Sequence, residues 1–114
     1  MKFGHDKMKY IKRHILVIPV FSVSLLNSAF GHAADFQEGK QKAFICTECH
    51  GERGVSLLSI YPNLAGQKYD YLINALTAYK SGSRINETMN GMLQNLTKKD
   101  IENLAAYYSQ LQCQ

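Results

Sequence analysis

The chain has 114 residues, a length that fits one domain. Five of its thirteen Lys and Arg residues and one of its nine Asp and Glu residues lie before residue 15, so residues 35–114 carry eight of each and no net side-chain charge. This balance leaves no basic surface of the kind that nucleic-acid binding requires, and we expect no nucleic acid among the partners.

The start of the chain has the three-part pattern of a secretory signal peptide. A basic N-terminal stretch is followed by an apolar run over residues 15–26 and then by small residues. The alternative is a retained membrane anchor, but a run of about a dozen apolar residues falls short of the roughly 20 that a spanning helix needs. We therefore predict a signal peptide over residues 1–34, cleaved near Ala33 or Ala34, and a mature domain over residues 35–114 with no stable membrane insertion.

The first half of this domain predicts one helix and one long loop. Residues 35–50 have apolar side chains spaced for one buried face, which favours a short helix, and Gly51 ends it. Residues 52–67 contain Gly, Ser, Asn and one Pro without helical period. This composition predicts an irregular segment that wraps around another group.

The second half predicts two more helices. Apolar and Tyr side chains recur at three- and four-residue spacing over residues 68–80, which indicates an amphipathic helix. We predict irregular structure over residues 83–96. Thr97 followed three residues later by Asp100 is typical of a capping box at a helix start, and the last helix should extend to Leu111. Because no segment alternates with period two, the predicted fold class is all-α.

A mature domain of about 80 residues is close to the size at which one hydrophobic core is barely sufficient. Small exported domains of this size commonly depend on disulfides or a bound metal centre. The sequence contains only Cys46, Cys49 and Cys113, which allow at most one disulfide. A cofactor is therefore the more economical source of added stability.

Residues 46–50 read Cys-Thr-Glu-Cys-His, the C-x-x-C-H arrangement expected for covalent haem attachment. Positions three and four apart share one face of a helix. Cys46, Cys49 and His50 therefore point the same way, with two sulfurs for the haem vinyl groups and one imidazole for the iron.

Three other interpretations of this motif remain to be weighed. A thioredoxin-like dithiol needs a βαβ context, which the predicted elements lack. A zinc site could combine Cys46, Cys49 and His50 with Cys113, although three ligands within one helical turn would be crowded. A structural Cys46–Cys49 disulfide would leave His50 an ordinary surface residue.

The second axial position of a haem iron is often filled by a thioether in electron-transfer proteins. Met89 and Met92 are the methionines of residues 35–114, and either could supply that sulfur or simply fill a gap in the core. His32 lies within the predicted signal peptide, so His50 is the only histidine that remains after cleavage. Ligation by two histidines is then excluded.

These motifs together resemble the class I c-type cytochromes, in particular one domain of the small bacterial periplasmic proteins with two tandem haem domains. The resemblance covers residues 36–111, and it is carried by Gly39 and by residues 46–51, 61–67, 79–84, 89–92 and 104–108. It implies a small cytochrome c fold in which three to four helices wrap around one covalently bound haem c. It also implies a periplasmic location.

The resemblance further implies the roles of single residues. Met89 corresponds to the distal iron ligand and Met92 to a methionine that packs nearby, with Met92 as the second choice for the ligand. Pro62 corresponds to a proline whose carbonyl oxygen accepts the N–H of the proximal imidazole of His50. Such an acceptor would fix the tautomer and the ring angle of the histidine.

A haem with both axial positions filled by protein has no open position for a substrate, which favours an electron carrier over an enzyme. The expected partners are redox proteins, such as a quinol-oxidising complex and a terminal oxidase or reductase. Two alternatives are a haem-based peroxidase or gas-binding protein with a displaceable distal Met, and a docked subunit of an oxidoreductase complex. Cys113 is an odd thiol that could form a disulfide dimer after export.

Overall fold

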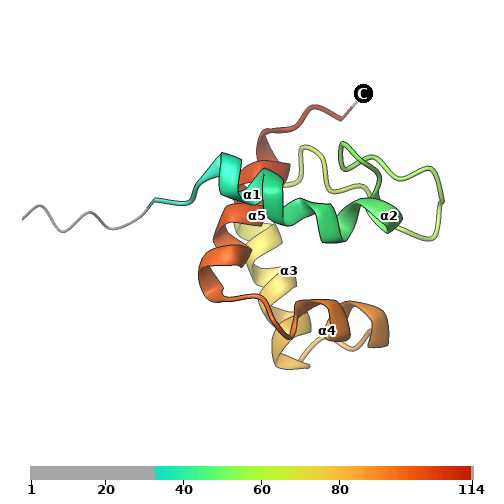
Figure 1. The fold of residues 1–114 in the computed structure, drawn as a ribbon. Coiled ribbons are helices and arrows are strands. Elements are labelled where there is room, and N and C mark those ends of the chain that lie inside the picture. The colour runs from blue at the N-terminus through green and yellow to red at the C-terminus, as the bar shows by residue number, and fades with distance from the viewer. Residues whose placement is uncertain (1–32, 114) are drawn as a thin grey trace, which may run out of the picture.

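The structure is a computed structural model that describes residues 33–113, and this part of the chain is helical without any strand (Figure 1). The predicted all-α fold is therefore confirmed. No helix among residues 33–113 is long and apolar enough to cross a membrane. Residues 1–32 of the predicted signal peptide, which include His32, lie outside the described residues.

The predicted first helix is one bent segment made of three consecutive pieces. These are α1 (Phe36–Lys42), a 3-10 turn η1 (Ala43–Cys46) and the single turn α2 (Thr47–His50). The Asp35 carboxylate begins α1 by accepting a hydrogen bond from the Glu38 amide at 2.9 Å. Gly51 ends α2 with φ of 84°, a conformation that favours glycine.

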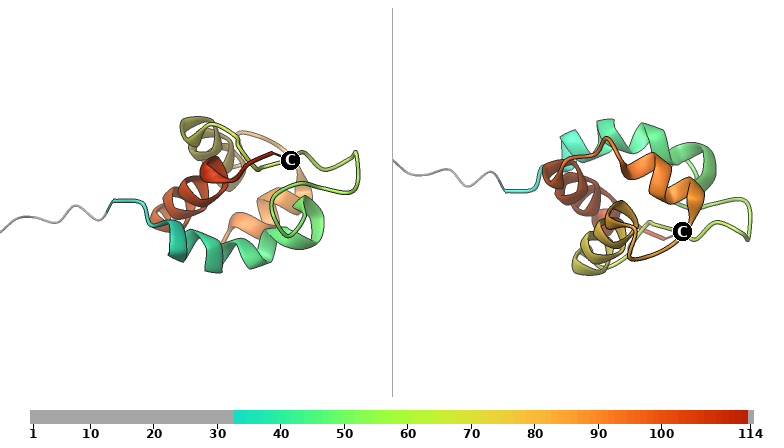
Figure 2. Two further views of the ribbon diagram at one scale, coloured as in Figure 1. Left: turned by 90° about the horizontal axis from the view of Figure 1, so that it is seen from above. Right: turned by 90° about the horizontal axis from the view of Figure 1, so that it is seen from below.

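The N-terminal segment packs against the last helix, α5 (Lys98–Gln110), where the two cross at Gly39. A Cβ atom at Gly39 would lie 2.9 Å from the Tyr107 Cβ and still closer to the backbone of Asn103. The absence of a side chain therefore sets how closely α1 approaches α5. Both views of Figure 2 show the two helices side by side.

The core lies where α5 meets α3 (Tyr69–Ser81), the helix predicted over residues 68–80. Asn103, Tyr107 and Tyr108 of α5 are buried together with a set of apolar side chains, namely Ala43, Leu72, Leu93, Leu96, Ile101, Leu104 and Ala105. The predicted capping box is confirmed: Thr97 Oγ1 accepts from the Asp100 amide at 3.1 Å, and the Asp100 carboxylate accepts from the Thr97 amide at 2.8 Å.

The prediction of irregular structure over residues 83–96 was wrong, because the structure forms a helix there, α4 (Glu87–Leu93). Asn86 caps its start by accepting a hydrogen bond from the Met89 amide at 3.0 Å. Near the C-terminal end of α4, the Lys80 ammonium group donates a hydrogen bond to the carbonyl oxygen of Gln94 at 2.7 Å. A helix of 7 residues that contains a glycine shows too little apolar periodicity to be recognised from sequence.

Candidate haem-binding site

The C-x-x-C-H residues lie where η1 passes into α2. Cys46 ends η1, and Cys49 and His50 occupy the single turn of α2. All three cysteines of the described residues are free thiols, so the structure does not form the alternative Cys46–Cys49 disulfide. His50 is only 6% exposed, and it is therefore not the ordinary surface residue that the disulfide interpretation required.

The imidazole of His50 is held by the loop that follows it. His50 Nδ1 lies 2.8 Å from the carbonyl oxygen of Pro62. Because a carbonyl oxygen can only accept, Nδ1 must be the protonated nitrogen, and Nε2 keeps its lone pair free for a metal ion. The structure thus brings His50 and Pro62 together in the way that the resemblance implied.

The loop over residues 52–67 is fixed at several points, although it contains no regular helix or strand. The Ser56 hydroxyl donates to the Cys49 carbonyl at 2.8 Å, and Asn63 Oδ1 accepts from the Ser56 amide at 2.8 Å. The Gly54 carbonyl accepts from the Leu64 amide at 2.8 Å. These bonds position the Pro62 carbonyl relative to α2. Asn63 lies in the stretch 61–67 that carries the family resemblance, but nothing in the local sequence had singled out Ser56.

The two attachment sulfurs have unequal surroundings. Burial raises the pKa of the Cys46 thiol, an effect that the nearby Tyr108 hydroxyl partly offsets. The hydroxyl of Tyr61 lies beside the Cys49 thiol, and hydrogen bonding to this thiol raises the pKa of Tyr61. Its ring also contacts His50, with ring centroids 6.1 Å apart. Each sulfur therefore has one tyrosine hydroxyl as a neighbour.

The two candidate methionines both lie on α4 but differ in exposure. Met89 packs against the core, whereas Met92 is 44% exposed. In Figure 1, α2 and α4 lie on the right side of the molecule, α2 above α4, with α5 and α3 to their left. The fold therefore presents both a histidine-bearing turn and a methionine-bearing helix on one side of the α3–α5 pair.

The side chains present fit a haem better than a zinc ion. Several apolar side chains beside Cys46 are only partly buried, and the apolar ring of a haem could cover them. They come from the loop, α3 and α4 and are Leu64, Ile73, Leu76, Tyr79 and Met89. Within residues 33–113, no three His, Cys, Asp or Glu side chains gather as a zinc site would need. The donor set of two thiols and one oriented imidazole is that of covalent haem attachment.

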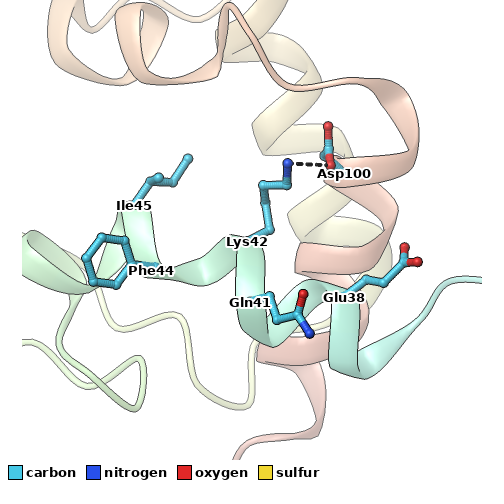
Figure 3. Close-up of a pocket in the computed structure, with 6 residues that line it drawn as sticks. All are labelled: Glu38, Gln41, Lys42, Phe44, Ile45 and Asp100. Atoms are coloured by element: carbon cyan, nitrogen blue, oxygen red, sulfur yellow. Dashed lines mark ion pairs between the residues drawn. The ribbon is translucent and has the colours of Figure 1, made fainter.

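Two hollows of the described surface lie away from His50 and the two methionines. One of about 460 Å³ lies beside α1, η1 and the start of α5 and is crossed by an ion pair between Lys42 Nζ and Asp100 Oδ1 at 3.0 Å (Figure 3). A second, of about 300 Å³, lies near Arg53 and Gln112. Neither is lined by His50 or by the two methionines, so the candidate site is identified by its donor atoms.

The comparisons with known proteins agree with this geometry. The sequence pattern of the family "Cytochrome c" matches residues 36–112. Cytochrome c-554(548) of Halomonas halodenitrificans is 42% identical over 80 residues, which cover 68% of this chain and 96% of that protein. Cytochrome c4 of Thiocapsa roseopersicina is 41% identical over 83 residues, which cover 72% of this chain and 43% of that protein. The chain thus spans less than half of this cytochrome c4.

Solved structures with the same fold include cytochrome c4 of Acidithiobacillus ferrooxidans, with a TM-score of 0.64 and 38% identity over 68% of this chain and 50% of that one. Thiosulfate dehydrogenase (TsdBA) of Marichromatium purpuratum matches with a TM-score of 0.66 and 30% identity over 71% of this chain and 20% of that one. The chain therefore belongs to the cytochrome c family, and it is an electron-transfer protein with covalently attached haem c.

Proposed function

We propose that the protein is a periplasmic electron carrier with one haem c, attached through Cys46 and Cys49 and ligated by His50 and Met89. The observation that carries this proposal is the 2.8 Å contact between His50 Nδ1 and the Pro62 carbonyl oxygen. That contact fixes the tautomer that leaves Nε2 as a metal ligand, directly after two free thiols at the attachment spacing.

When bound, the haem supplies an iron that alternates between Fe(II) and Fe(III). The residues of the chain have to fix the position and orientation of the haem. The two cysteines anchor the ring, and the Pro62 carbonyl keeps the His50 ring from rotating. The partial burial of Met89 against the core supports it as the distal ligand in preference to the more exposed Met92. If His50 and Met89 both held the iron, no position would be open to a substrate, which favours a carrier over an enzyme.

The proposed setting is the periplasm, after removal of a signal peptide near Ala33 or Ala34. The proposed partners are a quinol-oxidising complex as donor and a terminal oxidase or reductase as acceptor. Contacts with such partners are transient and use small interfaces.

The test is expression of the full chain together with the haem-attachment machinery, followed by a pyridine haemochrome spectrum of the exported protein. We expect one haem per chain that resists extraction by acidic solvent, and an N-terminus at Ala34 or Asp35. The matched control replaces both attachment cysteines by Ser and should yield no covalent haem. A colourless exported protein whose Cys46 and Cys49 both react with a thiol reagent would overturn the proposal.

A docked subunit of an oxidoreductase is the second candidate. Relatives of this chain include a protein named thiosulfate dehydrogenase electron acceptor, from Thiomonas intermedia, and a cytochrome subunit of sulfide dehydrogenase, from Chlorobaculum tepidum. The loop over residues 52–67 exposes Leu57 at 98% and Ile60 at 76%, apolar area that a permanent partner would cover. Size-exclusion chromatography of the protein from its own host separates the two candidates, since only a subunit co-elutes with an oxidoreductase.

A further inference from the structure

The hydroxyl of Tyr108 is a buried polar group without a hydrogen-bond partner. Tyr108 is only 2% exposed, and its oxygen is the one buried side-chain N or O atom in residues 33–113 that lacks a partner. Burying a hydroxyl in this state destabilises the folded protein, because the group loses its hydrogen bonds to water. A phenylalanine would fill the same space without that cost, so the oxygen calls for an explanation.

The ring of Tyr108 packs against the loop after the attachment turn and belongs to the core cluster that Cys46 contacts. The edge of the ring packs against Gly54, where a Cβ atom would lie 2.9 Å from Tyr108 Cδ1. The ring also contacts the tilted ring of Tyr107, with ring centroids 4.9 Å apart. Cys46 packs against the same core cluster. The Cys46 thiol is close enough to raise the pKa of Tyr108, in addition to the larger effect of burial, although no hydrogen bond of acceptable geometry joins the two groups.

Haem attachment changes what the Cys46 sulfur can do. A thiol can donate or accept a hydrogen bond, whereas a thioether has lost its S–H and can only accept. Once Cys46 is a thioether, the hydroxyl must be the donor in any bond between the two. The hydrogen of a tyrosine hydroxyl can take either of two orientations in the plane of the ring, so a small adjustment suffices to direct it at the sulfur.

We propose that Tyr108 is a positioning residue for the haem, in which its hydroxyl donates a hydrogen bond to the Cys46 thioether sulfur and thereby raises the reduction potential. This inference rests on the proposed attachment through Cys46. The positive end of the O–H dipole faces the haem edge in a buried, low-dielectric environment and favours the less positively charged, reduced iron. Hydrogen bonding around the cofactor is one of the means by which proteins set a haem potential.

The test is the variant Tyr108→Phe, which removes one oxygen and leaves the ring packing intact. We expect a two- to fivefold shift of the reduction equilibrium toward the oxidised form, or about 20–40 mV at about 59 mV per tenfold. The matched control is Tyr107→Phe, which removes the same atom from the adjacent ring that packs against Phe36 at 5.2 Å. The control should leave the reduction equilibrium constant unchanged to within a few tenths of a fold.

A second readout is vibrational. Resonance Raman spectra of the haem-loaded protein should show a C–S stretching band that shifts when the protein is transferred to D2O, because the donated hydrogen exchanges. The shift should persist in Tyr107→Phe and vanish in Tyr108→Phe. If Tyr108→Phe failed to fold, the wild-type protein alone would still decide, since an isotope-insensitive band overturns the inference.

The outcomes separate this inference from the proposed function. Absence of covalent haem from the wild-type protein would overturn the proposed function itself. Covalent haem with an unchanged potential in Tyr108→Phe would overturn only the role of Tyr108. An equal fall in potential in both variants would also overturn it, because the effect would then come from the general polarity of α5 and not from a bond to Cys46.

Discussion

At the level of single residues, the site depends on groups that hold the ligands as much as on the ligands. His50 can present Nε2 because a carbonyl oxygen of the loop engages Nδ1 at 2.8 Å. The Pro62 carbonyl is in turn positioned by the bond from Ser56 Oγ to the Cys49 carbonyl, which ties the loop to the attachment turn. The attachment motif is local and was predicted from five adjacent letters. The contacts of Ser56, Tyr61 and Tyr108 were not, because they join segments that meet only in the folded chain.

The two methionines of α4 give a prediction at this scale. Met89→Ala should abolish the weak absorption band of sulfur-to-iron ligation, and it should lower the reduction potential by on the order of 0.1 V, within the about 0.8 V that axial ligands span. Met92→Ala is the matched control and should keep both properties, since Met92 is 44% exposed. Optical spectra and a redox titration of both variants measure this; a band that is lost only in Met92→Ala would move the ligand to that residue.

At the level of elements, the crossing of α1 and α5 fixes the framework on which the attachment turn is built. Asn103 of α5 is buried and uses both ends of its amide at this crossing. Its oxygen accepts from the Asp35 amide at 2.8 Å, and its nitrogen donates to the Glu38 carboxylate at 2.7 Å. The start of α1 is therefore anchored to α5 by polar bonds as well as by close backbone contact at Gly39.

A pair of glycine substitutions tests the crossing. Gly39→Ala should lower the free energy of unfolding by about 1–3 kcal/mol or more, because its Cβ would collide with the backbone of Asn103. Gly91→Ala on α4 is the control: a Cβ there meets no atom within 4 Å, and a helical alanine should add about 0.5–1 kcal/mol. Denaturant unfolding of the haem-loaded variants measures both, and equal effects would contradict the close approach at Gly39.

The cap of α5 predicts a pH dependence. The hydrogen bond from the Thr97 amide, and to a smaller extent Lys42, lowers the pKa of Asp100. A carboxylate with a lowered folded-state pKa stabilises the protein fully above its unfolded value of about 3.9, and this stabilisation is lost as the pH falls through the lower folded value. Asp100→Asn should therefore be less stable at about pH 7 by roughly 0.5–1 kcal/mol, with a smaller further loss on acidification.

The matched control for this prediction is Glu102→Gln. Glu102 is paired with Lys98 at 3.8 Å, but the Lys98 side chain is 93% exposed, and such a pair contributes little. Urea unfolding of the parent protein, Asp100→Asn and Glu102→Gln at neutral and acid pH measures the free energy of unfolding of each. An Asp100→Asn variant with the acid sensitivity of the parent would show that the cap does not carry this part of the stability.

The fold could be predicted to different depths along the chain. The helices α3 and α5 were found because Leu72, Leu104 and their neighbours recur at helical spacing and bury one face. The helix α4 was missed because Gly91 and two methionines give a short segment without a clear apolar face. The path of residues 52–67 could not be deduced, since it is set by single hydrogen bonds from Ser56 and Asn63 and not by any repeat.

At the level of the whole molecule, Cys113 predicts a change of assembly with redox conditions. Cys113 is exposed and lies near the C-terminal end of the chain, whereas Cys46 and Cys49 are only partly exposed. Under oxidising conditions we expect part of the purified protein to form a disulfide dimer, and reductant should return it to a monomer. The control Cys113→Ser should stay monomeric on size-exclusion chromatography in both conditions, with its haem spectrum unchanged. A dimer that persists in Cys113→Ser would require a non-covalent interface.

The turn before α4 has a consequence for how the protein ages. The Asn90 amide nitrogen donates to the carbonyl oxygens of Tyr79 and Arg84, and its oxygen accepts from the Asn86 amide at 2.8 Å. Asn90 is followed by Gly91, a pair that deamidates readily in flexible peptides but is held here in a helix. Loss of this amide would replace the donor by a carboxylate facing two carbonyl oxygens, so deamidation of Asn90 should loosen the turn between α3 and α4.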